Sequence, residues 1–425
     1  MPFSEKTQSM SAGEPARALW ISTVAFTVCF AVWTIFAIIG IRIKQELGLN
    51  EAEFGLLVGT PVLTGSVVRI LLGIWTSRYG GRLVYTLTML AAAVATFLLS
   101  YATTYAEMLI AGLGVGLAGG SFAVGVAYVS PFFPPDKQGT ALGIFGAGNV
   151  GAAVTKFAAP FVLIAWGWQA VAEIWALVLA ATAIIFWFST TDDPAFRDRR
   201  SRGVGSKSFL EEFAPLRSVQ VWRFSLYYFF AFGGFVALSL WLPRYLVGVY
   251  GFNLEAAGMI AAAYSIPGSI FRAFGGVLSD KKGARSVMYA MLAVSAVATL
   301  ILSLPAAAAS ASGSDPAFGV TPVIFIVVIF VLGFFMSLGK AAVYKHIPAY
   351  YPESVGAVGG IVGMMGGLGG FILPIAFGLL KDITGLWSSC FLLLFVIVVA
   401  SLIWMHLSVK QLSRQGHSAP AVAAT

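Results

Sequence analysis

Charged residues are scarce in this chain of 425 residues: only 10% are Asp, Glu, Lys or Arg, whereas 59% are hydrophobic. Soluble domains carry about 25% charged residues, so too few polar side chains are present to cover a water-soluble protein of this size. The chain also has only three histidines and two cysteines, which offer neither a disulfide framework nor a metal-ligand cluster. These absences exclude a soluble enzyme and indicate an integral membrane protein without a metal or cofactor.

Long apolar runs, in contrast, are abundant. A membrane-spanning helix needs about 20 apolar residues, and twelve runs reach this length. The expected spans are 19–41, 54–76, 84–104, 107–131, 139–163, 168–190, 222–245, 255–279, 285–305, 319–345, 356–380 and 386–408. The polar residues 1–17 lack the pattern of a cleaved secretory signal, so we expect the first run to remain in the protein. The sequence thus predicts an all-α membrane protein with twelve transmembrane helices in a lipid bilayer.

A charged stretch at 191–220 divides these spans into six and six. About thirty residues cannot bury a core of their own, which favours a linker over a small soluble domain. We expect an N-terminal six-helix half at 1–190, a linker at 191–221, a C-terminal six-helix half at 222–410 and a tail at 411–425.

The net charge of +8 is distributed unevenly along the chain. An even number of spans places both termini on one side, where 17 basic residues would lie against four on the other side. Cytoplasmic loops are enriched in Lys and Arg. We therefore expect a multi-pass protein of the cytoplasmic (inner) membrane with both termini and the linker in the cytoplasm. The positive charge indicates orientation and not nucleic-acid binding.

An internal repeat relates the two halves at an offset of 203 residues. The matching positions are small or polar, which shared exposure to lipid would not produce. They pair Gly48, Asn50, Gly55, Gly65, Ser66, Arg69, Gly73, Gly80 and Arg82 with Gly251, Asn253, Gly258, Gly268, Ser269, Arg272, Gly276, Gly283 and Arg285. Repeated halves are typical of transporters that hold their substrate between the halves, near the bilayer midplane.

Each repeat carries a loop motif after its second span, at 73–82 and at 276–285. Both copies resemble the cytoplasmic loop motif of the major facilitator superfamily, and they follow the second and eighth spans, where that family has it. The first copy has Ser77 where an aspartate is usual, and the second keeps Asp280. The resemblance covers nearly the whole chain and implies the superfamily fold of two six-helix halves, as a monomer.

Five basic residues fall inside the expected spans: Arg69, Lys156, Arg272, Lys340 and Lys345. Charge inside a membrane is costly and marks functional sites. Arg69 and Arg272 are equivalent in the repeat. Because side chains lean toward the N-terminus of their helix, both should point to the midplane and not to the cytoplasmic surface. No Asp or Glu lies near the middle of a span, so the two arginines predict a site for a small oxyanion that guanidinium forks can bind.

Two glycine-rich stretches, 143–160 and 359–374, lie in the fifth and eleventh expected spans. Close helix packing is one reason for such glycine density. Both stretches also resemble the paired signatures of the nitrate/nitrite porter family, and Arg69 and Arg272 stand where that family has its substrate arginines. The resemblance implies transport of nitrate, and of nitrite, by alternating access. The signature glycines with an implied gating role are Gly143, Gly146, Gly148, Gly151, Gly363, Gly366, Gly367, Gly369 and Gly370.

The same resemblance implies that Asn149 and the rings of Phe122, Tyr228 and Phe232 contact the flat anion. Tyr228 and Phe232 are spaced i, i+4 and therefore share a helix face. Ordinary packing is the alternative role for each ring.

Lys156 lies deep in the fifth expected span. A lysine here resembles the branch of the family associated with nitrate/proton symport, which implies that Lys156 loads and releases a proton. The alternatives are a side chain that reaches the outer water, and nitrate/nitrite antiport in which this lysine does not cycle. Lys340 and Lys345 are expected to reach the cytoplasmic surface from the end of the tenth span, with His346 beside them.

Other classes of protein remain as alternatives. A channel is disfavoured by the repeat and the loop motifs. A carrier of organic anions or sugar phosphates, which also use paired arginines, is disfavoured by the glycine stretches, which predict a smaller cavity. Transport of another small anion stays open as an alternative.

Overall fold

The computed structural model describes residues 13–202, 217–306, 319–351 and 355–414, and these ranges are almost entirely helical. Helices are expected because a bilayer offers no water to backbone N–H and C=O groups, which must pair within their own segment. In chain order the helices are α1 (Glu14–Trp33), α2 (Phe36–Leu47), α3 (Glu51–Tyr79), α4 (Gly81–Leu99), α5 (Tyr105–Val115), α6 (Leu117–Val129), α7 (Pro135–Gly146), α8 (Gly151–Ser189), α9 (Pro194–Arg202), α10 (Val219–Tyr228), α11 (Phe235–Tyr250), α12 (Leu254–Ile270), α13 (Arg272–Lys282), α14 (Ala284–Leu302), α15 (Pro322–Tyr350), α16 (Val355–Thr384) and α17 (Ser389–Arg414). Shorter turns are the 3₁₀ segments η1 (Ser130–Phe132) and η2 (Ala147–Val150) and the π-helical turn η4 (Phe229–Gly234).

Among the described residues, ten helical segments are long and apolar enough to cross a membrane, and the bent pair α12–α13 makes eleven. One of the ten, at 140–189, has 50 residues and would measure about 75 Å as a straight helix. The helix breaks at Gly167, where φ is 86°. The chain folds back there, as shown by the indole nitrogen of Trp175, which donates to Oγ1 of Thr155 at 2.9 Å. An all-α membrane fold is thus confirmed. The number of twelve spans stays a prediction.

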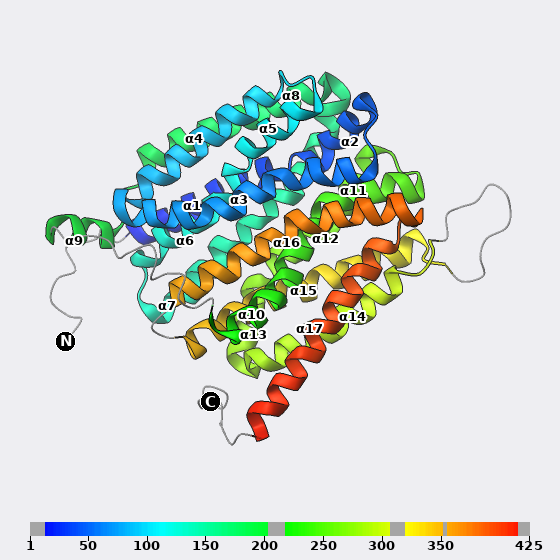
Figure 1. Ribbon diagram of the computed structural model, residues 1–425. Coiled ribbons are helices and arrows are strands. Elements are labelled where there is room, and N and C mark those ends of the chain that lie inside the picture. Colours follow the sequence, from blue (N-terminus) through cyan, green and yellow to red (C-terminus); the bar gives the residue numbers. More distant parts are fainter. Residues whose placement is uncertain (1–12, 203–216, 307–318, 352–354, 415–425) are drawn as a thin grey trace.

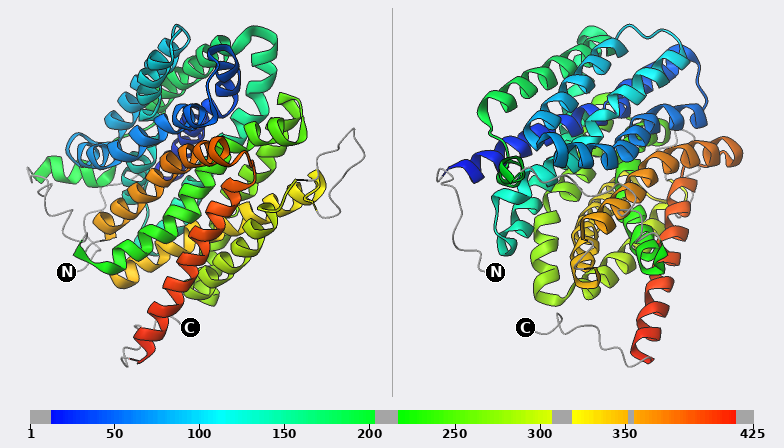
Figure 2. Two further views of the ribbon diagram at one scale, coloured as in Figure 1. Left: turned by 45° about the vertical axis from the view of Figure 1, so that its right-hand side comes forward. Right: turned by 60° about the vertical axis from the view of Figure 1, so that its left-hand side comes forward.

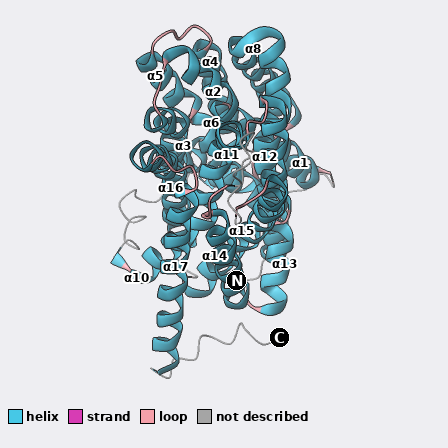
Figure 3. Cartoon of the chain, turned by 90° about the vertical axis from the view of Figure 1, so that its right-hand side faces the viewer, coloured by secondary structure: helices cyan, strands magenta, loops and turns pink. Residues whose placement is uncertain are grey.

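The helices before α9 and those after it form two groups. Figure 1 shows α1–α8, coloured blue to green, on one side of the molecule and α10–α17, coloured green to red, on the other. Both views of Figure 2 keep this separation, and Figure 3 shows loops only as connections between helices. We call α1–α8 the first bundle and α10–α17 the second bundle.

The two bundles meet most extensively where α3 runs alongside α16 (Figure 1). Glycine permits this close approach. A methyl group on Gly59 of α3 would lie only 2.9 Å from the carbonyl oxygen of Phe371 in α16. Small residues at such contacts let membrane helices pack backbone to backbone.

The molecule has two distinct ends along the helix axes. The start of α1, helix α9 and the end of α17 lie at one end, which we call the near end (Figure 1). There Arg197 of α9 forms a 2.8 Å ion pair with Glu14 of α1. The connections α2–α3, α11–α12 and α16–α17 lie at the opposite, far end. Much of the expected linker and tail falls outside the described residues, so the boundaries of the halves stay predictions.

Candidate functional site

Arg69 and Arg272 lie close together between the two bundles. Arg69 is inside α3, Arg272 is the first residue of α13, and their exposed fractions are only 7% and 8%. Their guanidinium carbons lie 5.6 and 5.5 Å from the ring centroid of Phe122 in α6. One aromatic ring is thus within cation–π distance of both charges. The structure brings together these three residues that the sequence singled out.

Further aromatic rings surround the pair. The ring of Phe232 lies 5.5 Å from the Arg69 guanidinium carbon, and it stacks on Tyr228 with a centroid distance of 5.2 Å and an interplanar angle of 8°. The expected shared face of Tyr228 and Phe232 is therefore present, although Phe232 belongs to the π-helical turn η4. Both side chains are buried.

The sequence did not predict two further aromatic rings of the site. Tyr344 of α15 lies 5.8 Å from the Arg272 guanidinium carbon, and Trp33 of α1 lies 5.8 Å from that of Arg69. Tyr344 lies at the end of the tenth expected span, next to Lys345 and His346, where the sequence predicts the cytoplasmic interface. Trp33 lies in the middle of the first apolar run, whereas Trp is usually found at membrane interfaces. This unusual position could have marked Trp33 as a candidate site residue.

Several buried donors at the site are unpaired. Arg69 donates through Nη1 to the carbonyl oxygen of Gly363 at 3.2 Å. Within the described residues, Nε of Arg69, Nη1 of Arg272 and Nδ2 of Asn149 have no hydrogen-bond partner. A buried donor left unpaired costs about 1–3 kcal/mol, and more when it is charged. Three such donors favour a ligand that brings acceptor oxygens.

Asn149 belongs to the 3₁₀ segment η2 and is 1% exposed. This segment directly follows Gly146, where a methyl group would lie 3.3 Å from Nη1 of Arg272. The expected amide donor is therefore held on a segment beside the second arginine. Broken or irregular helices near the midplane are typical of transporter substrate sites. Here Asn149, Phe232 and Arg272 each lie at such an irregularity.

Eight of the nine signature glycines, all except Gly143, lie at tight contacts with other helices. In the fifth expected span, Gly143 and Gly146 face α13, and Gly148 and Gly151 face α1. In α16, a methyl group on Gly363 would lie 2.7 Å from the Tyr344 hydroxyl. The other four meet Tyr228 (Gly366), Ser66 (Gly367), Phe229 (Gly369), and Val62 and Val236 (Gly370). Close packing is thus present, and a gating role stays a prediction.

Lys156 is fully buried, so the expected alternative of a side chain reaching outer water is wrong. Its ammonium donates to Oγ of Ser265 in α12, and this hydroxyl is 3.1 Å from Oγ of Ser239 in α11. Lys156 therefore connects the first bundle to the second. Ser265 precedes Arg272 by seven residues, which places the contact about 10 Å from the arginine toward the far end.

The predicted exposure of Lys340 is also wrong. The sequence predicted that Lys340 reaches the surface, but its side chain is 0% exposed. It packs on α12, whereas Lys345 is half-exposed and pairs with Asp280 of the loop motif. The difference follows from helix rotation, since five residues advance a helix by about 500° and change the face that a side chain occupies.

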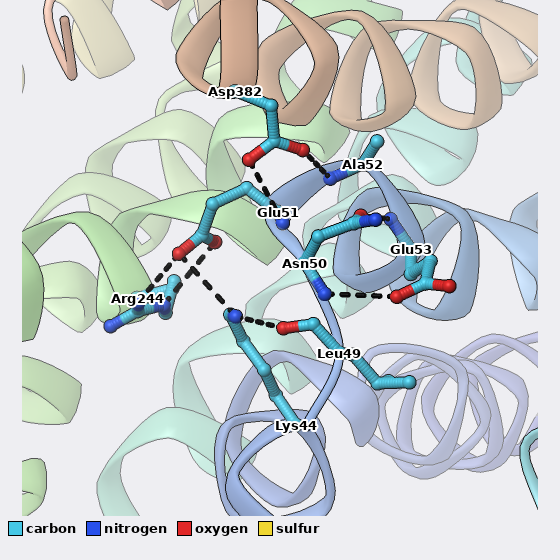
Figure 4. A network of polar contacts seen from close by, with 8 residues as sticks. All are labelled: Lys44, Leu49, Asn50, Glu51, Ala52, Glu53, Arg244 and Asp382. Carbon is cyan, nitrogen blue, oxygen red and sulfur yellow. Dashed lines mark hydrogen bonds and ion pairs between the residues drawn. The ribbon is translucent and has the colours of Figure 1, made fainter. Parts of the chain in front are cut away.

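A polar network closes the far end of the molecule (Figure 4). Arg244 of α11 donates to Glu51 of α3 at 2.5 Å, and Lys44 lies 3.6 Å from the same carboxylate. The carboxylate of Asp382 in α16 accepts hydrogen bonds from the amides of Glu51 and Ala52, at 3.2 and 2.8 Å. An anion at a helix N-terminus is stabilised by the helix dipole. The contacts of Arg244 with Glu51 and of Asp382 with the start of α3 join the first bundle to the second.

No group of three or more His, Cys, Asp or Glu side chains suited to a metal ion occurs in the part of the chain that the structure describes. Two helical bundles with a cationic site between them have the arrangement of a secondary transporter.

Comparison with known proteins agrees with this class. The model of the Major Facilitator Superfamily matches residues 21–314 and 253–423. A crystal structure of a bacterial homologue of the human lysosomal transporter Spinster, inward-facing and unoccupied, has a TM-score of 0.72 at 18% identity, over 97% of this chain and 100% of that one. That similarity shows the fold.

Proteins similar in sequence define the family within this superfamily. A protein of Thermus thermophilus named "Probable nitrate/nitrite antiporter NarK1" is 43% identical, over 94% of this chain and 93% of that protein. The "Nitrite extrusion protein" of Bacillus subtilis is 30% identical, over 91% and 94%. The "Probable nitrate transporter NarT" of Staphylococcus epidermidis is 29% identical, over 92% and 96%. The chain belongs to the Major Facilitator Superfamily and, within it, to the nitrate/nitrite porter family.

Proposed function

We propose that this protein carries nitrate, and also nitrite, across the cytoplasmic membrane by alternating access. The observation that supports this most strongly is the pair Arg69 and Arg272, which both lie within cation–π distance of one aromatic ring and retain buried donors without partners among the described residues. The printed names of the relatives agree with this substrate class.

Nitrate suits such a site chemically. It is planar, so it can lie between aromatic rings while its edge accepts paired N–H bonds from a guanidinium fork. In the proposed complex Arg69 and Arg272 hold the oxygens, Asn149 supplies an amide donor, and Phe122, Tyr228 and Phe232 enclose the flat faces. The bound anion screens the repulsion between the two arginines, which allows the bundles to close around it.

Alternating access requires the bundles to move against each other. The far-end contacts of Glu51 and Asp382 open to admit the anion from outside, and the near end opens to release it. In this proposal the near end is cytoplasmic, because the basic residues concentrate there. The glycines of α16 and of the fifth span provide smooth surfaces for the movement. The halves are assigned to 1–190 and 222–410, and the protein works as a monomer.

We assign Lys156 as the proton-coupling residue, which makes the transport nitrate/proton symport. Its burial and its contact with Ser265 of the second bundle support this role, because a change in its protonation would change a contact between the bundles. Nitrate/nitrite antiport is the second candidate, and the name of the Thermus relative favours it.

Purified protein in liposomes separates the two mechanisms. Symport requires nitrate uptake driven by a pH gradient, acidic outside, into liposomes without internal anion substrate. Antiport requires uptake that depends strictly on internal nitrite and is insensitive to the gradient. Absence of nitrate and nitrite flux under both conditions would refute the proposed substrates, and competition by phosphate would redirect the assignment to larger oxyanions.

A further inference from the structure

Lys340 in α15 is a buried charge that the proposed transport mechanism does not use. Its side chain is 0% exposed, and its ammonium donates to the carbonyl oxygen of Gly268 at 2.5 Å. The ammonium also lies 3.5 Å from the ring centroid of Phe235. Among the described residues no carboxylate lies within ion-pair distance of it. The carbonyl and the ring therefore provide the stabilisation that a buried cation needs.

The bonded carbonyl lies where a helix breaks. Helix α12 ends at Ile270, Phe271 leaves the helical conformation with ψ near 3°, and α13 begins at Arg272. The two helices meet at an angle of 42°. In an unbroken helix the amide of Arg272 would donate to the carbonyl of Gly268, whereas here Lys340 donates to it. The last carbonyls of a helix lack intrahelical donors, and a cation is favourable at that end.

The equivalent segment of the first bundle has no such break. Gly65 and Arg69 correspond to Gly268 and Arg272 in the repeat, and both lie inside the continuous 29-residue helix α3. Arg69 therefore extends from a helix interior, and Arg272 extends from the first residue of a new helix. The break is a property of the second bundle, where Lys340 caps the preceding helix.

The backbone at Gly268 packs tightly against Phe235. A methyl group on Gly268 would lie 2.8 Å from Cδ2 of Phe235, so the glycine lets the ring and the backbone approach closely. Lys340 lies against both. Its stem comes from α15, which also carries Tyr344, one turn further on and 5.8 Å from the Arg272 guanidinium carbon.

We propose that Lys340 is a positioning residue for Arg272. By capping α12 it holds the bend, and the bend sets the guanidinium of Arg272 within cation–π distance of Phe122, the ring that Arg69 also approaches. This role deepens the proposed anion transport and rests on it. Removal of the ammonium frees the Gly268 carbonyl to take the Arg272 amide, which straightens the helix and moves the guanidinium out of register with Arg69.

The test compares three variants of the full chain in liposomes: Lys340→Met, Lys340→Arg, and Lys345→Met as a control on the same helix. We expect Lys340→Met to raise the KM for nitrate at least tenfold while Vmax changes less than threefold and the number of protons per nitrate is unchanged. Lys340→Arg keeps a cationic donor and should restore KM to within threefold of wild type. Lys345→Met should leave KM unchanged.

A further variant, Phe235→Leu, tests the proposal if Lys340→Met does not fold. Phe235→Leu removes the ring under the ammonium but leaves the lysine, and it should raise KM about threefold with Vmax preserved. A KM within a factor of 1.5 of wild type in whichever of these two variants folds would overturn the proposal. An altered proton stoichiometry in Lys340→Met would also overturn it, by making this lysine a proton carrier. A wild-type protein that moves no nitrate would instead refute the transport assignment, so the two failures are distinguishable.

Discussion

Glu51 and Arg244 join the two bundles at the far end, with Nη2 of Arg244 donating to Oε1 of Glu51 at 2.5 Å. Both side chains are largely buried, at 10% and 19% exposure, so solvent screens this pair less than a surface ion pair. A charge-assisted hydrogen bond contributes roughly 1.5–3 kcal/mol. The pair therefore contributes to the closure of this end.

Glu51→Gln should open the far end more often. In a protein without its two native cysteines, both of which are buried, a single Val62→Cys should react up to about tenfold faster with a membrane-impermeant maleimide added outside. The glutamine still accepts a hydrogen bond from Arg244, but a neutral hydrogen bond contributes about 1–1.5 kcal/mol less than a charge-assisted one. Glu53→Gln is the matched control, because within the described residues the Glu53 carboxylate bonds only the nearby amide of Asn50. Equal labelling rates in both variants would contradict the role of Glu51.

Replacement of either arginine of the proposed anion site should abolish transport. Arg69→Lys and Arg272→Lys keep the charge but lose the planar fork of donors, so we expect nitrate uptake by the reconstituted protein to fall more than 100-fold. Arg42→Lys is the control, since Arg42 is exposed and, in the part of the chain that the structure describes, pairs only with Glu46 one turn away. Uptake within threefold of wild type in either site variant would remove that arginine from the anion site.

The glycines of α16 should differ sharply in their tolerance of alanine. A methyl group on Gly367 would overlap the hydroxyl group of Ser66 in α3, whereas one on Gly360 meets nothing within 4 Å. Gly367→Ala should therefore lower the uptake rate more than tenfold. Gly360→Ala should leave it within twofold and stabilise the helix by about 1 kcal/mol. Uptake rates and thermal unfolding of the two purified variants check this, and equal uptake rates would argue against close contact of α3 and α16 during transport.

Lys156→Met should uncouple transport from protons. Without an ionisable group between α8 and α12, an inward proton gradient should no longer drive nitrate accumulation, while exchange of external for internal nitrate persists. Proton and nitrate fluxes measured together in liposomes test this, with Lys345→Met as the control that retains coupling. If accumulation by Lys156→Met still follows the gradient, the proton is carried elsewhere.

The residues of the proposed anion site could be predicted from the sequence to different degrees. Arg69, Arg272 and Phe122 were singled out because charge inside apolar runs is rare, because the repeat pairs the arginines, and because the family resemblance supplies the ring; the structure brings all three together. Tyr344 and the burial of Lys340 were missed. Hydropathy places a residue along a span to within a few positions but does not give its rotation about the helix axis, which decides whether it meets water or a neighbouring helix.

The sequence by itself determined the membrane class, the repeat and the presence of unpaired positive charge in the spans, because each depends on composition over about 20 residues or on identity at a fixed offset. Only the tertiary structure decided which groups meet. Asp382 caps α3 across 330 residues, Lys156 reaches Ser265 in the other bundle, and Lys340 caps the bend before Arg272. These contacts depend on how remote helices pack and where they break, and no local pattern in the sequence encodes that.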